Sequence, residues 1–200
     1  MTRNFRRGDA GQAFPIYITV VAGLLFLALA YLAVGQAATN RNGAQTAADA
    51  AALAAAQEVR DQLAGEWEDN ILDPASWERI FDGLGAGLND ACWRAAQLAS
   101  QNDAHVDDCG PDGVLAYRVE VTTDDPVGES LVPGTENKHA RASAVAVIEP
   151  NCEPRLPGEH GKDDVPPKLA CEGQEWDLDP EDLSDLPEPQ DLFDVHLADG

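Results

Sequence analysis

The stretch that decides the fold runs from Phe14 to Val34, reads FPIYITVVAGLLFLALAYLAV and contains no charged residue. A helix rises about 1.5 Å per residue, so about 20 apolar residues cross a hydrocarbon layer about 30 Å thick. We therefore predict a single transmembrane helix over residues 14–35. It separates a short basic stub, residues 1–13, from everything that follows.

The charge of the chain is distributed unevenly about this segment. The chain has 200 residues and a formal net charge of −23. Arg3, Arg6 and Arg7 precede the apolar run, whereas nearly all the acidic residues follow it. Because positive residues are retained on the cytoplasmic side, we predict a cell-membrane protein with a cytoplasmic N-terminus and an extracytoplasmic C-terminal domain. A balance this acidic argues against nucleic acid as a partner, because its phosphates would repel the chain.

All four cysteines, Cys92, Cys109, Cys152 and Cys171, follow the apolar run. An even number in an exported acidic domain predicts disulfides, and four cysteines allow three pairings. We favour Cys92–Cys109 and Cys152–Cys171, because each pair closes a short loop within one segment. The alternative is four free thiols in a reducing compartment. None of the spacings is CxxC, so we predict no zinc site.

The apolar run has two interpretations, a permanent anchor or a cleaved signal peptide. Gly35 and Ala37 are compatible with a signal-peptidase site, but the apolar core of a signal peptide is only about 7–15 residues long. Strong helix formers continue past the membrane boundary from Ala44 to Leu63, AQTAADAAALAAAQEVRDQL. We therefore predict an uncleaved anchor that continues into an alanine-rich helical stalk over residues 36–64. Gly43 weakens this helix without breaking it.

One face of the predicted stalk carries small apolar side chains. They recur at steps of three and four residues, which places them on one side of a helix. Alanine side chains bury little area, but they let another element approach the backbone closely. The face packs either on the protein's own head or on neighbouring subunits of a filament or membrane complex. Its residues are Ala48, Ala52, Ala55, Ala56, Val59 and Leu63.

Two motifs flank the apolar run, RGDAGQA at residues 7–13 and NGAQTAADAAALAAA at residues 42–56. Together with the single predicted membrane helix, they resemble the N-terminal region of TadE/TadG-like proteins. These proteins are envelope components of the tight-adherence (Flp-type) pilus assembly system. The resemblance implies a pseudopilin-like, non-catalytic accessory role in pilus assembly or secretion. It also implies a place in the lipid bilayer and association with other Tad/Flp membrane proteins or pilin-like subunits through helix packing of Ala44–Leu63.

The same resemblance bears on processing of the N-terminus. In the pseudopilin branch of the family, cleavage follows a glycine that has Glu five residues and Tyr six residues downstream. Counted from Gly11, Tyr17 is in place, but Ile16 stands where that branch has Glu. The chain is therefore more similar to TadG-like members, which resemble permanently anchored proteins.

Residues 65–149 predict a small α+β extracytoplasmic head. Residues 73–82 begin with Asp-Pro, which is typical of a helix start, and a second helix is expected over residues 88–100. We expect Trp77 and Trp93 to lie in the core.

Two segments of the head alternate between apolar and polar residues, at 114–122 and 139–148. They predict an antiparallel β-hairpin with a long loop, lying on the helices with Tyr117 and Val119 facing them. The segment from His105 to Cys109 adjoins a Gly/Pro-rich turn, so we predict a solvated loop there rather than a metal cluster.

Residues 150–200 form an acidic, proline-rich tail, for which we predict extended or partly disordered structure. Asp177 to Asp182 resembles a calcium loop only superficially, because it lacks glycine at the sixth position. We expect no metal, no cofactor and no catalytic residue, since no nucleophile–base order or phosphate-binding glycine loop is found. The alternative to the pilus role is a membrane-tethered acidic module that binds cations or cell-wall material.

Overall fold

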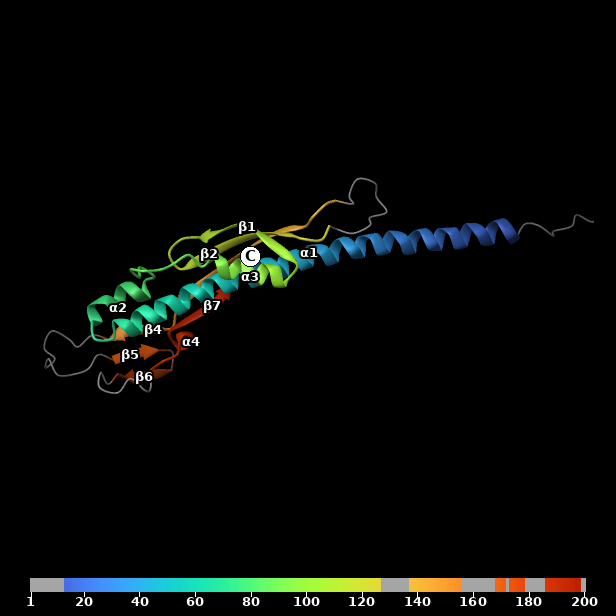
Figure 1. Ribbon diagram of the computed structural model, residues 1–200. Coiled ribbons are helices and arrows are strands. Elements are labelled where there is room, and N and C mark those ends of the chain that lie inside the picture. The colour runs from blue at the N-terminus through green and yellow to red at the C-terminus, as the bar shows by residue number, and fades with distance from the viewer. Residues whose placement is uncertain (1–12, 127–136, 156–167, 172, 179–185, 199–200) are drawn as a thin grey trace, which may run out of the picture.

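The computed structural model describes residues 13–126, 137–155, 168–171, 173–178 and 186–198, and it has a mixed helix-and-sheet fold, as predicted. Its largest element is helix α1, Ala13–Asp69, which has 57 residues. At about 1.5 Å per residue this helix is about 86 Å long. Figure 1 shows a rod whose N-terminal half is bare and whose C-terminal half is covered by the other elements.

The sequence of α1 explains why it is unbroken. Its one proline, Pro15, lies in the first turn, where the missing N–H is not needed. Threonine hydroxyls are satisfied inside the helix. Thr19 donates to the carbonyl of Pro15 at 2.8 Å, and Thr39 donates to that of Gly35 at 3.0 Å. Alanine, which has the highest helix propensity, fills much of the remainder.

Two antiparallel sheets form around the C-terminal half of α1. The larger has the order β1-β2-β3-β7, and the smaller has the order β4-β5-β6. The predicted pair of strands is present as β2 and β3, but they are the two central strands of the larger sheet rather than an isolated hairpin. The strands are β1 (Ala104–Pro111), β2 (Ala116–Thr123), β3 (Arg141–Pro150), β4 (Cys152–Arg155), β5 (Lys168–Cys171), β6 (Gln174–Asp177) and β7 (Phe193–Leu197).

Three shorter helices complete the described fold, namely α2 (Pro74–Phe81), α3 (Cys92–Gln101) and α4 (Pro189–Leu192). The prediction for α2 was correct to within one residue at each end. Helix α3 begins later than residue 88, because the Asp90 carboxylate accepts the backbone N–H of Cys92 at 3.0 Å in the turn that precedes it.

The core lies between α1 and one face of the larger sheet. Val119 and Val121 of β2 are buried on that face, together with Ala146 and Ile148 of β3. The prediction that Val119 faces the helices is confirmed, while Tyr117, two residues earlier on the same face, is half-buried. The described head is therefore a helix layer on a sheet.

A cluster of aromatic residues closes the core at the C-terminal end of α1. The ring centroids of Trp67 and Trp77 are 5.7 Å apart, and those of Phe81 and Phe193 are 5.2 Å apart. The indole of Trp77 donates to the carbonyl of Asn70 at 3.0 Å. Because Phe193 comes from the predicted tail, the tail contributes directly to the core.

The prediction that Trp93 lies in the core was wrong. Trp77 is 0% exposed, but Trp93 is 56% exposed. Helix α3 buries Ala95 and Ala99 instead. Positions two residues apart face different directions on a helix, so Trp93 cannot share the buried face of Ala95.

The tail contributes more regular structure to the fold than predicted where the structure describes it. Residues 150–200 contain β4, β5, β6, α4 and β7, and β7 pairs with β3 in the larger sheet. The prolines permit this because of where they lie: Pro154 is in β4, an edge strand of the smaller sheet, and two others are at element boundaries. Pro150 is the last residue of β3, and Pro189 is the first residue of α4. The remaining tail residues, 156–167, 172, 179–185 and 199–200, lie outside the described residues.

The predicted loop from His105 to Cys109 is part of strand β1. His105 is paired with Thr122 and Cys109 with Val119, and the register shifts between Val106 and Asp108. The acidic residues and the irregularity are compatible with a strand because β1 is an edge strand, where charges and bulges are common.

Candidate membrane anchor and packing surface

The bare half of α1 contains the predicted membrane span. Phe14–Gly35 is a 22-residue stretch long and apolar enough to cross a membrane. Phe26 is 72% exposed and Tyr31 is 83% exposed, and no residue of the protein's described part covers this stretch. Exposed apolar area costs about 25 cal/mol per Å² in water, so a helix this bare requires apolar surroundings. Tyr17 and Tyr31 lie near the two ends of the span, where amphipathic aromatic rings meet the membrane–water interface.

The environment of α1 changes between Gly35 and Ala44. Arg41, the first charged residue after the span, is exposed, and Ala44 is 0% exposed. The predicted stalk is thus no free-standing rod, because the head surrounds it from Ala44 onward. One continuous helix therefore serves both as the anchor and as the centre of the head.

The alanine face lies inside the head. Ala48, Ala52, Ala55, Ala56 and Leu63 are all 0% exposed, and Val59 is 4% exposed. This part of α1 contacts β2, β3, β7 and α3. The structure therefore assigns the face to the protein's own head, which was the first of the two interpretations, and leaves it closed to a neighbouring subunit.

Small side chains on both sides allow this close contact. Ala144 and Ala146 of β3, the strand in contact with α1, are buried as well. The alanines let the helix and the sheet approach closely, while Val119, Val121 and Ile148 supply the larger buried side chains of the layer. Such an interface has no room for larger residues.

Both favoured disulfides are present. Cys92–Cys109 joins the start of α3 to β1, and Cys152–Cys171 joins β4 to β5. They link residues 17 and 19 positions apart in the sequence. A loop of that size contributes about 3 kcal/mol in the chain-entropy description.

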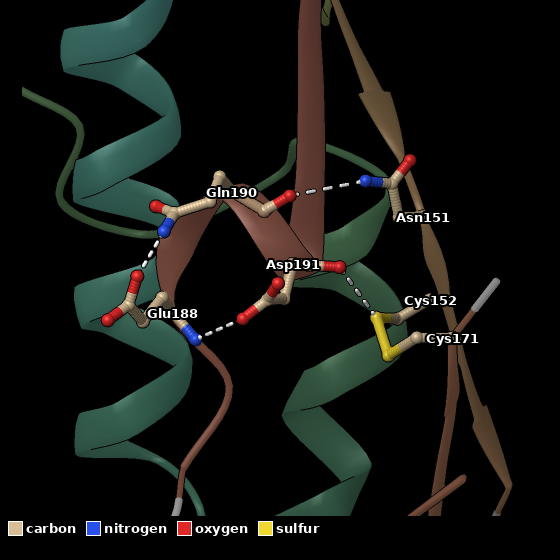
Figure 2. The surroundings of a disulfide bond; sticks show 6 residues. All are labelled: Asn151, Cys152, Cys171, Glu188, Gln190 and Asp191. Atoms are coloured by element: carbon tan, nitrogen blue, oxygen red, sulfur yellow. Dashed lines mark hydrogen bonds between the residues drawn. A yellow bond between two sulfur atoms is a disulfide. The ribbon is translucent and has the colours of Figure 1, made fainter. Parts of the chain in front are cut away.

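The second disulfide also connects the smaller sheet to α4 (Figure 2). The sulfur of Cys152 lies 3.3 Å from the carbonyl oxygen of Asp191. This is a close contact and not a hydrogen bond, because a disulfide sulfur carries no proton. The backbone N–H of Asn151 donates to the carbonyl of Leu192 at 2.9 Å, and its side-chain amide donates to the carbonyl of Gln190 at 3.4 Å. In turn, the N–H of Glu188 donates to the Asp191 carboxylate at 2.9 Å.

The histidine at the start of β1 makes contacts with two carboxylates. His105 Nδ1 lies 2.7 Å from an Asp124 carboxylate oxygen, and its Nε2 lies 3.6 Å from one of Asp107. Asp107 also accepts a hydrogen bond from Thr122. No group of three or more His, Cys, Asp or Glu side chains in the described part of the chain is placed to hold a metal ion. The contact of His105 with Asp124 could not be predicted from spacing, because 19 residues separate them.

The surroundings of Tyr117 in the head shift its pKa. Burial of its phenol raises the pKa above the ordinary value of 10.0, and the nearby Asp90 carboxylate raises it further. A hydrogen bond with the backbone of Ala91 acts in the opposite direction. The phenol is therefore held in its neutral form where β2 meets the start of α3.

Residues 11–58 match the family model Tad, described as putative Flp pilus-assembly TadE/G-like. The N-terminal helix region of this chain is TadE/G-like. The match covers the apolar span and the alanine face to Glu58, and it confirms the resemblance carried by the flanking motifs. No curated protein and no solved structure matches the chain. Combined with one membrane-spanning helix candidate, the TadE/G-like match indicates a Tad pilus-related, membrane-anchored protein.

Of the two residues of the suggested processing motif, the structure describes Tyr17 but not Gly11. Gly11 lies outside the described residues, whereas Tyr17 is exposed on the first turns of α1. The prediction of an uncleaved anchor therefore rests on the sequence pattern alone, in which Ile16 stands where the cleaved branch has Glu.

Proposed function

We propose that this protein is a single-pass, non-catalytic accessory component of a Tad/Flp-type pilus assembly or secretion apparatus. One observation supports this most strongly. The TadE/G-like region coincides with a helix that is bare over Phe14–Gly35 and buried in the head beyond it. Such a helix fixes a folded head to a membrane.

The proposed orientation places the N-terminus in the cytoplasm and the head outside. The basic residues Arg3, Arg6 and Arg7 support it, because positive flanks stay on the cytoplasmic side. The two disulfides support it independently, since they form and persist in oxidising compartments.

Association with other pilin-like subunits is proposed to occur through the span. The alanine face is occupied by the head, so residues 14–35 are the surface that α1 can offer to another helix. Helices in lipid associate by close packing of their side chains. We propose no catalysis, because the His–carboxylate contacts of the described head, at His105 and His196, are exposed rather than desolvated.

Photo-cross-linking in intact cells tests this proposal. A photoreactive residue is placed in turn at Leu24, Leu25, Phe26 and Leu27, which are about 100° apart around the helix and so sample the circumference of the span. We expect the positions on one side to capture another membrane-anchored pilus-system chain, identified by mass spectrometry. Gln57, exposed on the head, serves as the matched position outside the bilayer. A chain that is never captured from any of the four span positions contradicts packing through the span.

The second candidate function is the tethered acidic module, which the net charge of −23 favours. Deleting residues 174–200 cannot test it, because the deletion removes β7 and Phe193 from the core. Replacing the exposed Glu153 and Glu175 by Gln keeps the fold and lowers the charge. Loss of function with pilus assembly intact favours the module, and unchanged function argues against a role for these charges.

A further inference from the structure

A groove lies beside the C-terminal end of α1, where the chain returns to that helix after the smaller sheet. It has a volume of about 300 Å³. Ala64 and Gly65 of α1 form part of its lining, and Leu186, Pro187 and Pro189 lie on the other side. A Cβ atom added at Gly65 would meet nothing within 4 Å, so the small residues leave this space open.

The groove is negatively charged at both ends. Asp61 and Glu68 line it and are exposed. They are seven residues apart, which is two helical turns or about 10.5 Å along α1. The described residues that line the groove include no lysine or arginine. Arg60 pairs with Asp61 at 2.8 Å, and its side chain is 18% exposed against 53% for that of Asp61, so a ligand cation would share this carboxylate with Arg60.

An unpaired hydrogen-bond donor lies next to this space. Trp67 lines the groove, is 1% exposed, and its indole Nε1 has no hydrogen-bond partner among the described residues. The indole of neighbouring Trp77, in contrast, is paired with the carbonyl of Asn70. A buried donor without an acceptor is unfavourable, and an acceptor supplied by a ligand would remove that penalty.

We infer that this groove binds an extended basic peptide segment of a partner protein. Its cationic side chains pair with Asp61 and Glu68, its apolar part packs on the proline-lined wall, and a backbone carbonyl accepts the indole N–H of Trp67. The charge of the groove favours a basic occupant over an acidic one. The inference rests on the proposed function only in requiring a protein partner outside the membrane.

The test uses the full chain, purified in detergent micelles, and the peptide acetyl-Lys-Pro-Leu-Lys-Pro-amide. Its two lysines are three residues apart, about 9 Å in a polyproline II helix, which suits the separation of Asp61 and Glu68. We expect a saturable shift of the Trp67 indole N–H resonance, assigned with Trp67→Phe. The same peptide with Glu in place of Lys should leave this resonance unchanged.

Variants of the groove decide the outcome. Asp61→Asn together with Glu68→Gln should weaken binding about tenfold, whereas Asp69→Asn, an exposed charge of the same helix outside the groove, should not change it. No saturable shift, unchanged affinity in the double variant, or an equal loss in Asp69→Asn would each overturn the inference. Because no pilus is present in this assay, a negative result alongside successful cross-linking from the span refutes the groove alone.

Discussion

Ala48, Ala52, Ala55 and Ala56 are completely buried in the head, although each contributes only a methyl group to the core. Their role is to set the distance between α1 and the sheet, since the facing residues of β3 include Ala144 and Ala146. At such positions the volume of a side chain matters more than its hydrophobicity, because a packed interior tolerates added atoms poorly.

Replacing Ala52 by Leu should therefore destabilise the head by about 1–3 kcal/mol, as expected for overpacking. Urea unfolding of the chain in detergent, followed by the near-ultraviolet circular dichroism of its tryptophans, measures the change. Gln57→Leu adds an apolar residue at an exposed position of the same helix and should stay within about 0.5 kcal/mol of the parent. Equal stability of the two variants would show that the interface around Ala52 has room for a larger side chain.

Tyr117 makes the stability of the head sensitive to alkaline pH. Its pKa is raised in the folded chain by burial and by Asp90, so the folded state holds the phenolic proton more tightly than the unfolded state. This contribution is complete below the ordinary pKa of 10.0 and is lost as the pH rises through the folded-state value.

We expect tyrosinate absorbance to show a group that titrates above 10.0 and is missing in Tyr117→Phe. The variant should also lose less stability than the parent as the pH rises past that value. A difference titration with a midpoint at or below the ordinary pKa would contradict the burial of this phenol.

Strand β7 shows how an element near the end of the chain completes a fold. It pairs with β3 from Ala146↔Leu197 to Pro150↔Phe193. Phe193 is 0% exposed and stacks on Phe81 of α2. This strand therefore joins the sheet to the aromatic cluster at the C-terminal end of α1.

Phe193→Ala should cost about 3–5 kcal/mol, the usual range for removing a buried aromatic side chain. It should also increase hydrogen exchange at the β3 amides of Val147 and Glu149, which lie opposite β7. Asp194→Ala, at an exposed neighbouring position, should leave both the stability and the exchange rates nearly unchanged. Protection of β3 that survives Phe193→Ala would argue that β7 is dispensable.

Elements with strong local signals could be predicted from the sequence, and elements that depend on distant partners could not. Nearby residues alone determine the elements of the first kind: the apolar run, α2 after Asp73-Pro74, and the alternating strands β2 and β3. The strand β7 was not predicted, because the acidic, proline-rich composition of the tail hid the alternation of Phe193, Val195 and Leu197, which was the available signal. Its partner, β3, lies more than 40 residues earlier, and no local rule connects the two.

The candidate anchor could be predicted from the sequence because it is a local feature, whereas the groove could not because it is formed by distant segments. A membrane span can be recognised from the composition of one continuous stretch of sequence. The groove cannot, because Asp61 and Glu68 line the same space as Pro187 and Pro189 only after the chain has folded. The alanine face was visible in the sequence, but its partner was not, since small residues suit a sheet and a second helix equally well.

At the scale of the whole molecule, the chain is divided between a bare apolar half of α1 and an acidic, disulfide-linked head. We expect the chain to remain in the membrane fraction through high-salt and carbonate washes and to require detergent for release. Alkylation should modify its four cysteines only after reduction, as a mass measurement of the mature protein would show. A freely soluble chain trimmed near Ala37, or cysteines alkylated without a reductant, would contradict this arrangement.

The continuity of α1 has a mechanical consequence. The helix passes from the span into the head without a break, so the described chain has no joint at Gly35 or Gly43 that could isolate one part from the other. About 51 Å of helix extends from Gly35 to Asp69, and a swing of about 10° at the bilayer would carry that tip about 9 Å sideways. The helix therefore acts as a rigid lever: a tilt of the span, Phe14–Gly35, in the bilayer is transmitted to any partner bound near Asp69.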